Sequence, residues 1–329
     1  MTQLDNQFGI SDEVTYGTRV TPATFVDINS EGIEPQQNNR VSAGLRKSQR
    51  VQRSDRVSVA AKGANGPVQM DVAAQGLAKF LKHLFGAAPT TSQPDAVNNP
   101  DVYEHSFVLG DGAALSFSAQ VGRPGTAGTV KPFDYLGGKI ADGTITQAID
   151  AYATLDLTCD FQAEENNQTL VASPTYPSEI NLFHDGHLTI TVNGTEFDSK
   201  TSSLKIDRQL ALDRFFQRAS TLKKPPIVQA LIQPTGSLMG EFEDDTTHDL
   251  FVAGTPVAIV FDWVGEIIAG GDDTLNYELK FTMPACRLDG PKPTTKGPGI
   301  LDADTPFTVL YNGTDQPITA LLRTTDATA

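Results

Sequence analysis

Two histidines three residues apart are the first candidates for chemistry in this sequence. The segment FHDGHL places His184 and His187 on either side of Asp185 and Gly186. A pair of imidazoles could bind a transition metal, but no Cys, His or carboxylate set completes the site at a recognisable spacing. Asp-Gly is also a strong turn signal. We therefore expect a turn that carries two exposed imidazoles, and no metal.

A cluster of acidic residues is the second candidate. The segment GEFEDDTTHDL, residues 240–250, contains Glu241, Glu243, Asp244, Asp245, His248 and Asp249. Such carboxylates could bind calcium weakly, but they lack the spacing and the central glycine of an EF-hand. Acidic residues are favourable at the start of a helix, so a helix beginning here and ending at Gly254 is the expected structure.

No motif for catalysis or nucleotide binding is present. The glycine-rich segment VGRPGTAGTVKP, residues 121–132, is neither a Walker A motif nor a dinucleotide fingerprint, and no nucleophile elbow occurs. We therefore expect a protein that is not an enzyme and needs no cofactor.

A basic segment stands out in an acidic chain. The chain has 25 basic and 40 acidic residues, a net charge of −15, and residues outside 40–63 carry a net charge of −21. Residues 40–63 include one acid, Asp55, and seven bases: Arg40, Arg46, Lys47, Arg50, Arg53, Arg56 and Lys62. Without interleaved aromatic residues the segment does not look like a single-strand binder, and the remaining acidity repels phosphates. A nucleic-acid site and an assembly surface remain the two interpretations.

Composition limits the other classes. No stretch approaches the ~20 apolar residues of a membrane span, and the N-terminus lacks the basic and apolar regions of an export signal. The two cysteines, Cys159 and Cys286, lie in strand-like contexts and are expected to be buried, reduced thiols.

The second half of the sequence resembles the first at an offset of about 170 residues. Residues 22–35 match 194–207, and residues 66–87 match 236–255. We therefore predict two tandem domains, 1–172 and 173–329.

A basic segment follows the first match in each half. The counterpart of residues 40–63 is RQLALDRFFQRASTLKK, residues 208–224. Its candidate contact residues are Arg208, Arg214, Phe215, Phe216, Arg218, Lys223 and Lys224.

The elements expected around these segments are mostly strands, because short apolar stretches alternate with turn residues. Asn193–Gly194 fits a type I′ turn in a hairpin over 187–197, and 305–325 repeats that plan. The best helix is 72–86, where i, i+3, i+4 spacing predicts a core-facing stripe of Leu77, Phe80, Leu81, Leu84 and Phe85. The fold class is mostly β, with one helix in each domain.

Several segments together resemble the tail tube (major tail) proteins of long-tailed phages. The opening DEVTYGTRVTPATFVDINSEGI is similar to that family's N-terminal pattern at Glu13, Tyr16, Gly17, Thr18 and Pro22. Similar segments continue at 50–87, 121–140, 281–290 and 306–327, so the resemblance covers nearly the whole chain.

The resemblance implies a structural protein of the virion, made in the host cytoplasm. Such subunits form a β-sandwich or barrel flanked by a helix, and rings of them share a continuous β-barrel lumen. Stacked rings make a non-contractile tube that conducts DNA to the host cell without binding it specifically. The implied partners are the subunit itself, a tape measure protein, and the tail terminator and distal tail proteins. In this family's pattern the basic segment is a loop that reaches a neighbouring ring.

Two tube-like domains in each chain would let three chains form a ring with pseudo-sixfold symmetry, whereas a single one would require six chains. Two other functions stay open. One is the inner tube of a related contractile or secretion-type injection machine, and the other is a DNA-binding structural protein that uses residues 40–62.

Overall fold

The computed structural model describes residues 2–242, 245–268, 275–290, 295 and 297–329. The described chain is mostly β, every pairing between its strands is antiparallel, and two α-helices accompany them. The expected fold class is confirmed: a β-sandwich-like body flanked by a helix, not a closed barrel within one chain. The described residues also form 3₁₀ turns at Gln3–Asp5, Ser54–Arg56 and Asp185–His187.

The first half contains two sheets that share one long strand. The outer sheet has the order β2-β1-β8-β9-β11, and the inner sheet has the order β3/β4-β5-β10-β9. Strand β9 pairs with β8 through residues 130–138 and with β10 from residue 139 onward. The bounds are β1 (Gln7–Asp12), β2 (Thr24–Val26), β3 (Ser30–Glu31), β4 (Glu34–Val41), β5 (Val57–Asp71), β8 (Phe117–Pro124), β9 (Val130–Ala148), β10 (Thr154–Phe161) and β11 (Ala163–Glu165).

The second half has the same order of pairings. Its outer sheet is β13-β12-β16-β17-β19, and its inner sheet is β14-β15-β18-β17, with β17 again shared. The bounds are β12 (Leu188–Val192), β13 (Thr195–Glu196), β14 (Ser199–Asp207), β15 (Thr235–Glu241), β16 (Val257–Ile267), β17 (Asn276–Leu288), β18 (Asp302–Val309) and β19 (Thr319–Thr324).

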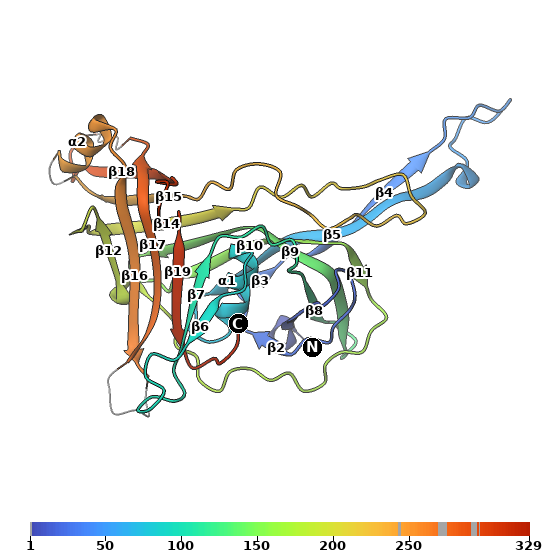
Figure 1. The fold of residues 1–329 in the computed structure, drawn as a ribbon. Helices are drawn as coiled ribbons and strands as arrows, with labels where there is room; N and C mark the ends of the chain where they lie inside the picture. Colours follow the sequence, from blue (N-terminus) through green and yellow to red (C-terminus); the bar gives the residue numbers. More distant parts are fainter. Residues whose placement is uncertain (1, 243–244, 269–274, 291–294, 296) are drawn as a thin grey trace.

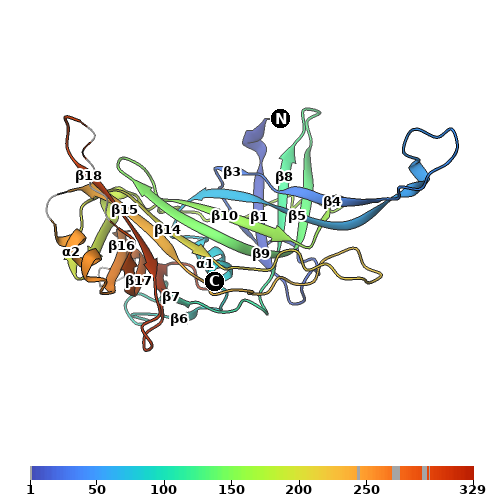
Figure 2. The same ribbon diagram turned by 90° about the horizontal axis from the view of Figure 1, so that it is seen from above.

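The two halves are joined along two strand pairs (Figures 1 and 2). Strand β9 pairs with β14, which makes one inner sheet from both halves. Strand β7 (Tyr103–Val108), which also pairs with β6 (Thr90–Ser92), extends the outer sheet of the second half beside β19. The buried apolar residues accordingly form one core that spans both halves.

The helix α1 (Leu77–Phe85) packs against that core and contacts both halves. The five residues of its predicted stripe are all buried. Phe80 stacks on Phe8 of the outer sheet, with ring centroids 6.4 Å apart, and Phe85 stacks on Phe281 of the second half at the same distance. The second helix, α2 (Thr246–Ala253), has no buried residue and ends at Gly254.

Two details differ from the sequence-based expectations. The helix begins at Leu77 and not at residue 72, because Val72 and Ala74 donate backbone hydrogen bonds to Ala153 and Asn181, and Gly76 adopts a left-handed conformation. The hairpin predicted over 305–325 is wrong, because β18 and β19 each pair with β17 and, among the described residues, not with each other. The turn at Asn193–Gly194 forms as expected, with positive φ at both residues.

Candidate assembly surfaces

The candidate metal ligands form no metal site in the described part of the chain. His184 caps a short turn, where its Nδ1 accepts a hydrogen bond from the Gly186 amide at 3.0 Å. Its ring lies against that of His187, with the centroids 3.6 Å apart and the planes tilted by 36°. The described residues contain no group of three or more His, Cys, Asp or Glu that could hold a metal. Of the acidic cluster, Glu243 and Asp244 lie outside the described residues.

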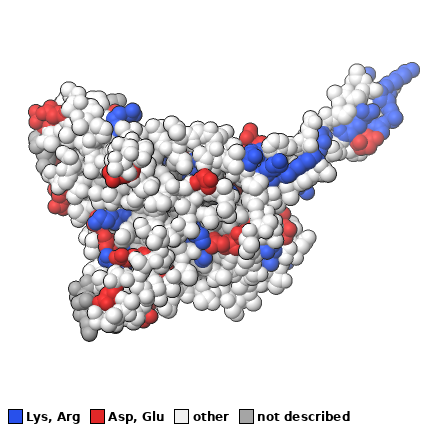
Figure 3. All heavy atoms as spheres, in the orientation of Figure 1, with Lys and Arg blue, Asp and Glu red and all other residues white. Residues whose placement is uncertain are grey.

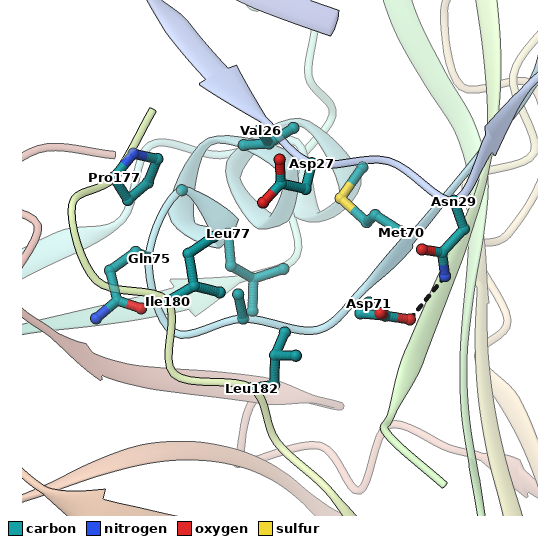
Figure 4. Close-up of a pocket in the computed structure, with 12 residues that line it drawn as sticks. Val26, Asp27, Asn29, Met70, Asp71, Gln75, Leu77, Pro177, Ile180 and Leu182 are labelled. Carbon is teal, nitrogen blue, oxygen red and sulfur yellow. Dashed lines mark hydrogen bonds between the residues drawn. The ribbon is translucent and has the colours of Figure 1, made fainter. Parts of the chain in front are cut away.

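A cavity of about 270 Å³ opens beside the start of α1 (Figure 4). Met70, Leu77 and Leu182 give it an apolar lining. At its edge the Asn29 amide donates to the Asp71 carboxylate at 2.6 Å. These two polar side chains satisfy each other and do not converge on the space. Asp27 and Gln75 also line the cavity.

The basic segment forms a hairpin that extends away from the body (Figures 1 and 2). Strands β4 and β5 pair along its length, and residues 42–56 make its tip; we call residues 34–62 the arm. All eight residues of β4 are exposed. Leu45 and Val51 at the tip are 100% and 75% exposed, so the tip presents apolar as well as charged side chains.

The arm concentrates positive charge in one place (Figure 3). Six of the seven predicted contact residues are exposed, and Arg53 is half-buried against Asp55. Two of these arginines donate hydrogen bonds within the hairpin: Arg40 to the Val59 carbonyl and Arg56 to the Ser42 hydroxyl. Among the described residues, Arg46, Lys47 and Arg50 have no side-chain partner, so their charges remain available to another molecule.

The counterpart segment of the second half takes a different course. Residues 208–234 form an irregular loop that runs back over the first half to the base of the arm, where Thr221 accepts a hydrogen bond from the Lys62 amide at 3.2 Å. Lys223 is buried in an ion pair with Asp160. Phe215 and Phe216 are half-exposed, and Lys224 lies 4.7 Å from the centroid of the Phe216 ring.

Arg208 is the most deeply buried charge of that loop. It is 2% exposed, and its guanidinium donates to the His83 carbonyl at 2.8 Å and to the Gly110 carbonyl at 3.1 Å. It thus caps the C-terminal end of α1, where a cation is favourable. Burial lowers the pKa of Arg208 to about 10. The expectation of an exposed contact is therefore wrong for Arg208 and Lys223, because both are paired within the chain. Arg214, Phe215, Phe216, Arg218 and Lys224 are still half-buried or exposed.

The inner sheet presents a polar face opposite its core face. Gly143 faces Leu84 of α1, while alternate residues of the strands point the other way. We call this side the polar sheet face. Its members are mostly Thr, Ser and carboxylates: Asp142, Thr144, Thr146, Thr154, Asp156, Thr158, Thr201, Ser203, Lys205, Asp207, Ser237, Glu241, Asp302 and Asp304. This face is not among the surfaces predicted from the sequence, although polar and apolar residues alternate in DGTIT (142–146) and TSSLKID (201–207).

Glu13, from the N-terminal pattern, organises the outer sheet of the first half. Its buried carboxylate accepts hydrogen bonds from the amides of Gly17 and Gly137 and from the hydroxyls of Ser116 and Ser118, each at 2.8 Å. Gly17 has a φ of 73°, which a side chain would disfavour. The pattern of an acid followed by Tyr-Gly therefore has a structural cause in this fold.

Comparison with protein families supplies the deciding observation. The model of a family described as "Phage tail tube protein" matches residues 3–309. The chain belongs to the phage tail tube protein family. A tail tube protein is a structural component of the virion tail and assembles with itself into a tube. A search of curated proteins found no match. Neither helix in the described residues of this tail tube protein has the length and hydropathy of a membrane span.

Proposed function

We propose that this tail tube protein polymerises as stacked rings into the tube that conducts DNA to the host cell. The observation that carries the proposal is the single inner sheet made from both halves, with a polar face and an unpaired β3/β4 edge among the described residues. Sheets of this kind must be closed or covered, because a free edge invites pairing with another chain. Barrels of about 16–18 strands or more enclose a channel, so a DNA-conducting lumen needs several subunits.

The polar sheet face is the proposed wall of the lumen. Six of its named members are carboxylates. Lys205 of this face binds Asp142, and Lys200, next to Thr201 in β14, binds Glu241 and Asp302. A wall of net negative charge repels phosphate, so DNA passes without being held. A tube structure with a strongly cationic lumen would contradict this assignment.

The arm is proposed to contact the acidic surface of subunits in a neighbouring ring. Residues 235–329 carry 15 acidic and five basic residues, which suits the basic tip. Each exposed ion pair contributes only about 0–1 kcal/mol, so the contact needs several pairs together with Leu45 and Val51.

Charge reversal of the tip tests this role. We expect the quadruple variant Arg46→Glu, Arg50→Glu, Arg53→Glu and Arg56→Glu to remain a folded monomer that no longer forms tubes. A matched control changes the same number of exposed charges away from the arm. Tubes of normal yield and length from the quadruple variant would rule out the role.

We further propose two tube-like domains, 1–172 and 173–329, and hence three chains in each ring with pseudo-sixfold symmetry. The repeated order of strand pairings supports this count. The same tube is proposed to be filled by a tape measure protein and to end at tail terminator and distal tail proteins.

Two competing functions predict different results with the purified protein. A DNA-binding structural protein would bind DNA in a salt-dependent manner as a free subunit, whereas we expect no such binding. An inner tube of a contractile or secretion-type machine would need a sheath or secretion genes beside its own gene. Negative-stain electron microscopy is the direct test: tubes or rings support the proposal, and a protein that stays dispersed at high concentration opposes it.

A further inference from the structure

Two adjoining cavities lie beside the segment that joins the two halves. The first is the cavity of about 270 Å³ at the start of α1, and the second has a volume of about 240 Å³. Ile180 and Leu182 line both cavities, and Tyr152 lines the second. Ile180 and Tyr152 are 45% and 52% exposed, so apolar side chains are open to another molecule here. We call the two cavities on either side of Ile180 and Leu182 the linker groove.

Carboxylates surround the apolar lining of the linker groove. Asp27 and Asp71 line the first cavity, and Glu266 lines the second. Glu179 is exposed next to Ile180. In the described part of the chain, no Lys or Arg forms an ion pair with any of these four carboxylates. The groove therefore fits a partner that combines apolar side chains with positive charge.

The tip of the arm has this combination. Leu45 is fully exposed and is followed directly by Arg46 and Lys47, which are exposed as well. A leucine side chain gains free energy by leaving water for an apolar cavity. The adjacent cations can then reach carboxylates at the rim, and such charge complementarity orients the two surfaces as they meet.

The arm cannot fill the groove of its own chain. Strand β5 connects the two features, because the tip precedes Val57 at one end and Met70 and Asp71 line the first cavity at the other. The 15 residues of this strand, at about 3.3 Å each, separate them by roughly 45–50 Å. Figures 1 and 2 show the arm extending away from the body. Complementary surfaces at opposite ends of one subunit join copies head to tail, in a contact that can repeat along an axis.

We propose that the linker groove of one copy receives the arm tip of a copy in the neighbouring ring. Leu45 enters the first cavity against Met70 and Leu182, and the cations that follow it pair with carboxylates at the rim. The inference rests on the proposed function. It adds the surface that receives the arm and the residue that anchors the tip.

Photo-crosslinking from the tip tests the contact directly. The variant Leu45→p-benzoylphenylalanine is assembled with an excess of unsubstituted, isotope-labelled chain, so that assembly does not depend on the substituted chain alone. We expect crosslinks from position 45 to labelled residues within 26–29, 70–77 and 177–182. Intact tubes in which position 45 reaches only other parts of the labelled chain, or gives no crosslink, would overturn the inference.

Point variants on both sides of the contact test its importance for assembly. Leu45→Asp and Ile180→Asp each put a charge where we place an apolar contact, and we expect folded monomers that no longer form tubes. Val97→Asp is the matched control, because Val97 is 88% exposed in the loop before β7, and it should assemble normally. Normal tube yield from Leu45→Asp or Ile180→Asp, or an equal loss from Val97→Asp, would contradict the assignment.

A charge variant covers the case in which Ile180→Asp does not fold. Asp27→Lys with Glu179→Lys changes two exposed side chains of the groove, and we expect it to fold and to lose tube formation. Normal tubes from this variant would count against the groove.

Failure of the inference differs from failure of the proposed function. If the unsubstituted chain forms no tubes, the proposed function is overturned. If it forms tubes in which position 45 does not reach the linker groove, only the inference is overturned.

Discussion

Arg208 offers the sharpest test of how the two halves are held together. Its side chain comes from the loop of the second half and binds the carbonyls of His83 and Gly110 at 2.8 and 3.1 Å in the first half. Replacement by methionine keeps much of the volume but removes both donors. The variant Arg208→Met therefore leaves two largely buried carbonyl groups without a partner.

The expected cost follows from two opposing effects. Each buried carbonyl left without a donor costs about 1–3 kcal/mol. Burying the guanidinium is itself unfavourable, as its pKa of about 10 indicates, and its removal returns part of that cost. We expect Arg208→Met to lower the free energy of unfolding by about 2–4 kcal/mol. Arg208→Lys keeps the charge but cannot reproduce both hydrogen bonds of the planar guanidinium. We expect it to lower the free energy of unfolding by less than Arg208→Met does.

Urea unfolding of the unpolymerised subunit measures this difference. Trp263, the single tryptophan of the chain, is 1% exposed in the second half and reports unfolding there by fluorescence. Far-ultraviolet circular dichroism reports the strands of both halves. The matched control is Arg218→Met, an exposed arginine of the same loop, which should change stability by less than about 0.5 kcal/mol.

An equally small loss of stability in Arg208→Met and Arg218→Met would contradict this role of Arg208. That result would mean that solvent satisfies the two carbonyls, and that Arg208 does not lock the halves together. A large effect with separate transitions for the two probes would instead show that Arg208 couples otherwise independent halves.

Two further predictions concern His83 of α1 and two closely packed glycines, Gly66 and Gly236. His83 is buried, and burial lowers its pKa although Asp12 lies 2.8 Å away. Below about pH 6.5, the ordinary pKa of histidine, the unfolded state therefore binds more protons than the folded state, and the free energy of unfolding should fall as the pH drops. His83→Gln should reduce this dependence of stability on pH. An unchanged dependence in His83→Gln would contradict the prediction. Gly66→Ala and Gly236→Ala should each lower the melting temperature markedly because a Cβ would lie within 2.4 Å of a backbone oxygen, whereas Gly265→Ala, whose nearest contact is 3.4 Å, should have a small effect.

The sequence was most informative where local rules decide the structure. The i, i+3, i+4 spacing identified the buried stripe of α1 because one face of a helix must enter the core. Asn193–Gly194 identified its hairpin because both residues accept positive φ. The start of α1 was misplaced because backbone bonds from Val72 and Ala74 to distant strands override the local pattern.

Features that depend on partners distant in the sequence could not be predicted from it. Arg208 looked like part of an exposed basic loop, since no local signal places its partners, His83 and Gly110, more than 90 positions earlier in the chain. The strand β19 was paired with the wrong neighbour because alternation predicts a strand but not its partner. The polar sheet face could not be predicted for the same reason. Its residues alternate locally, but only the β9–β14 pairing brings the two halves into one surface.

The proposed tube can be examined by cryo-electron microscopy of the assembled protein. We predict rings of three chains, in which six pseudo-equivalent sheets form one barrel and the polar sheet face lines the lumen. A ring of six chains in which only one half of each chain lines the lumen, or a tube whose lumen is formed by another surface, would contradict it.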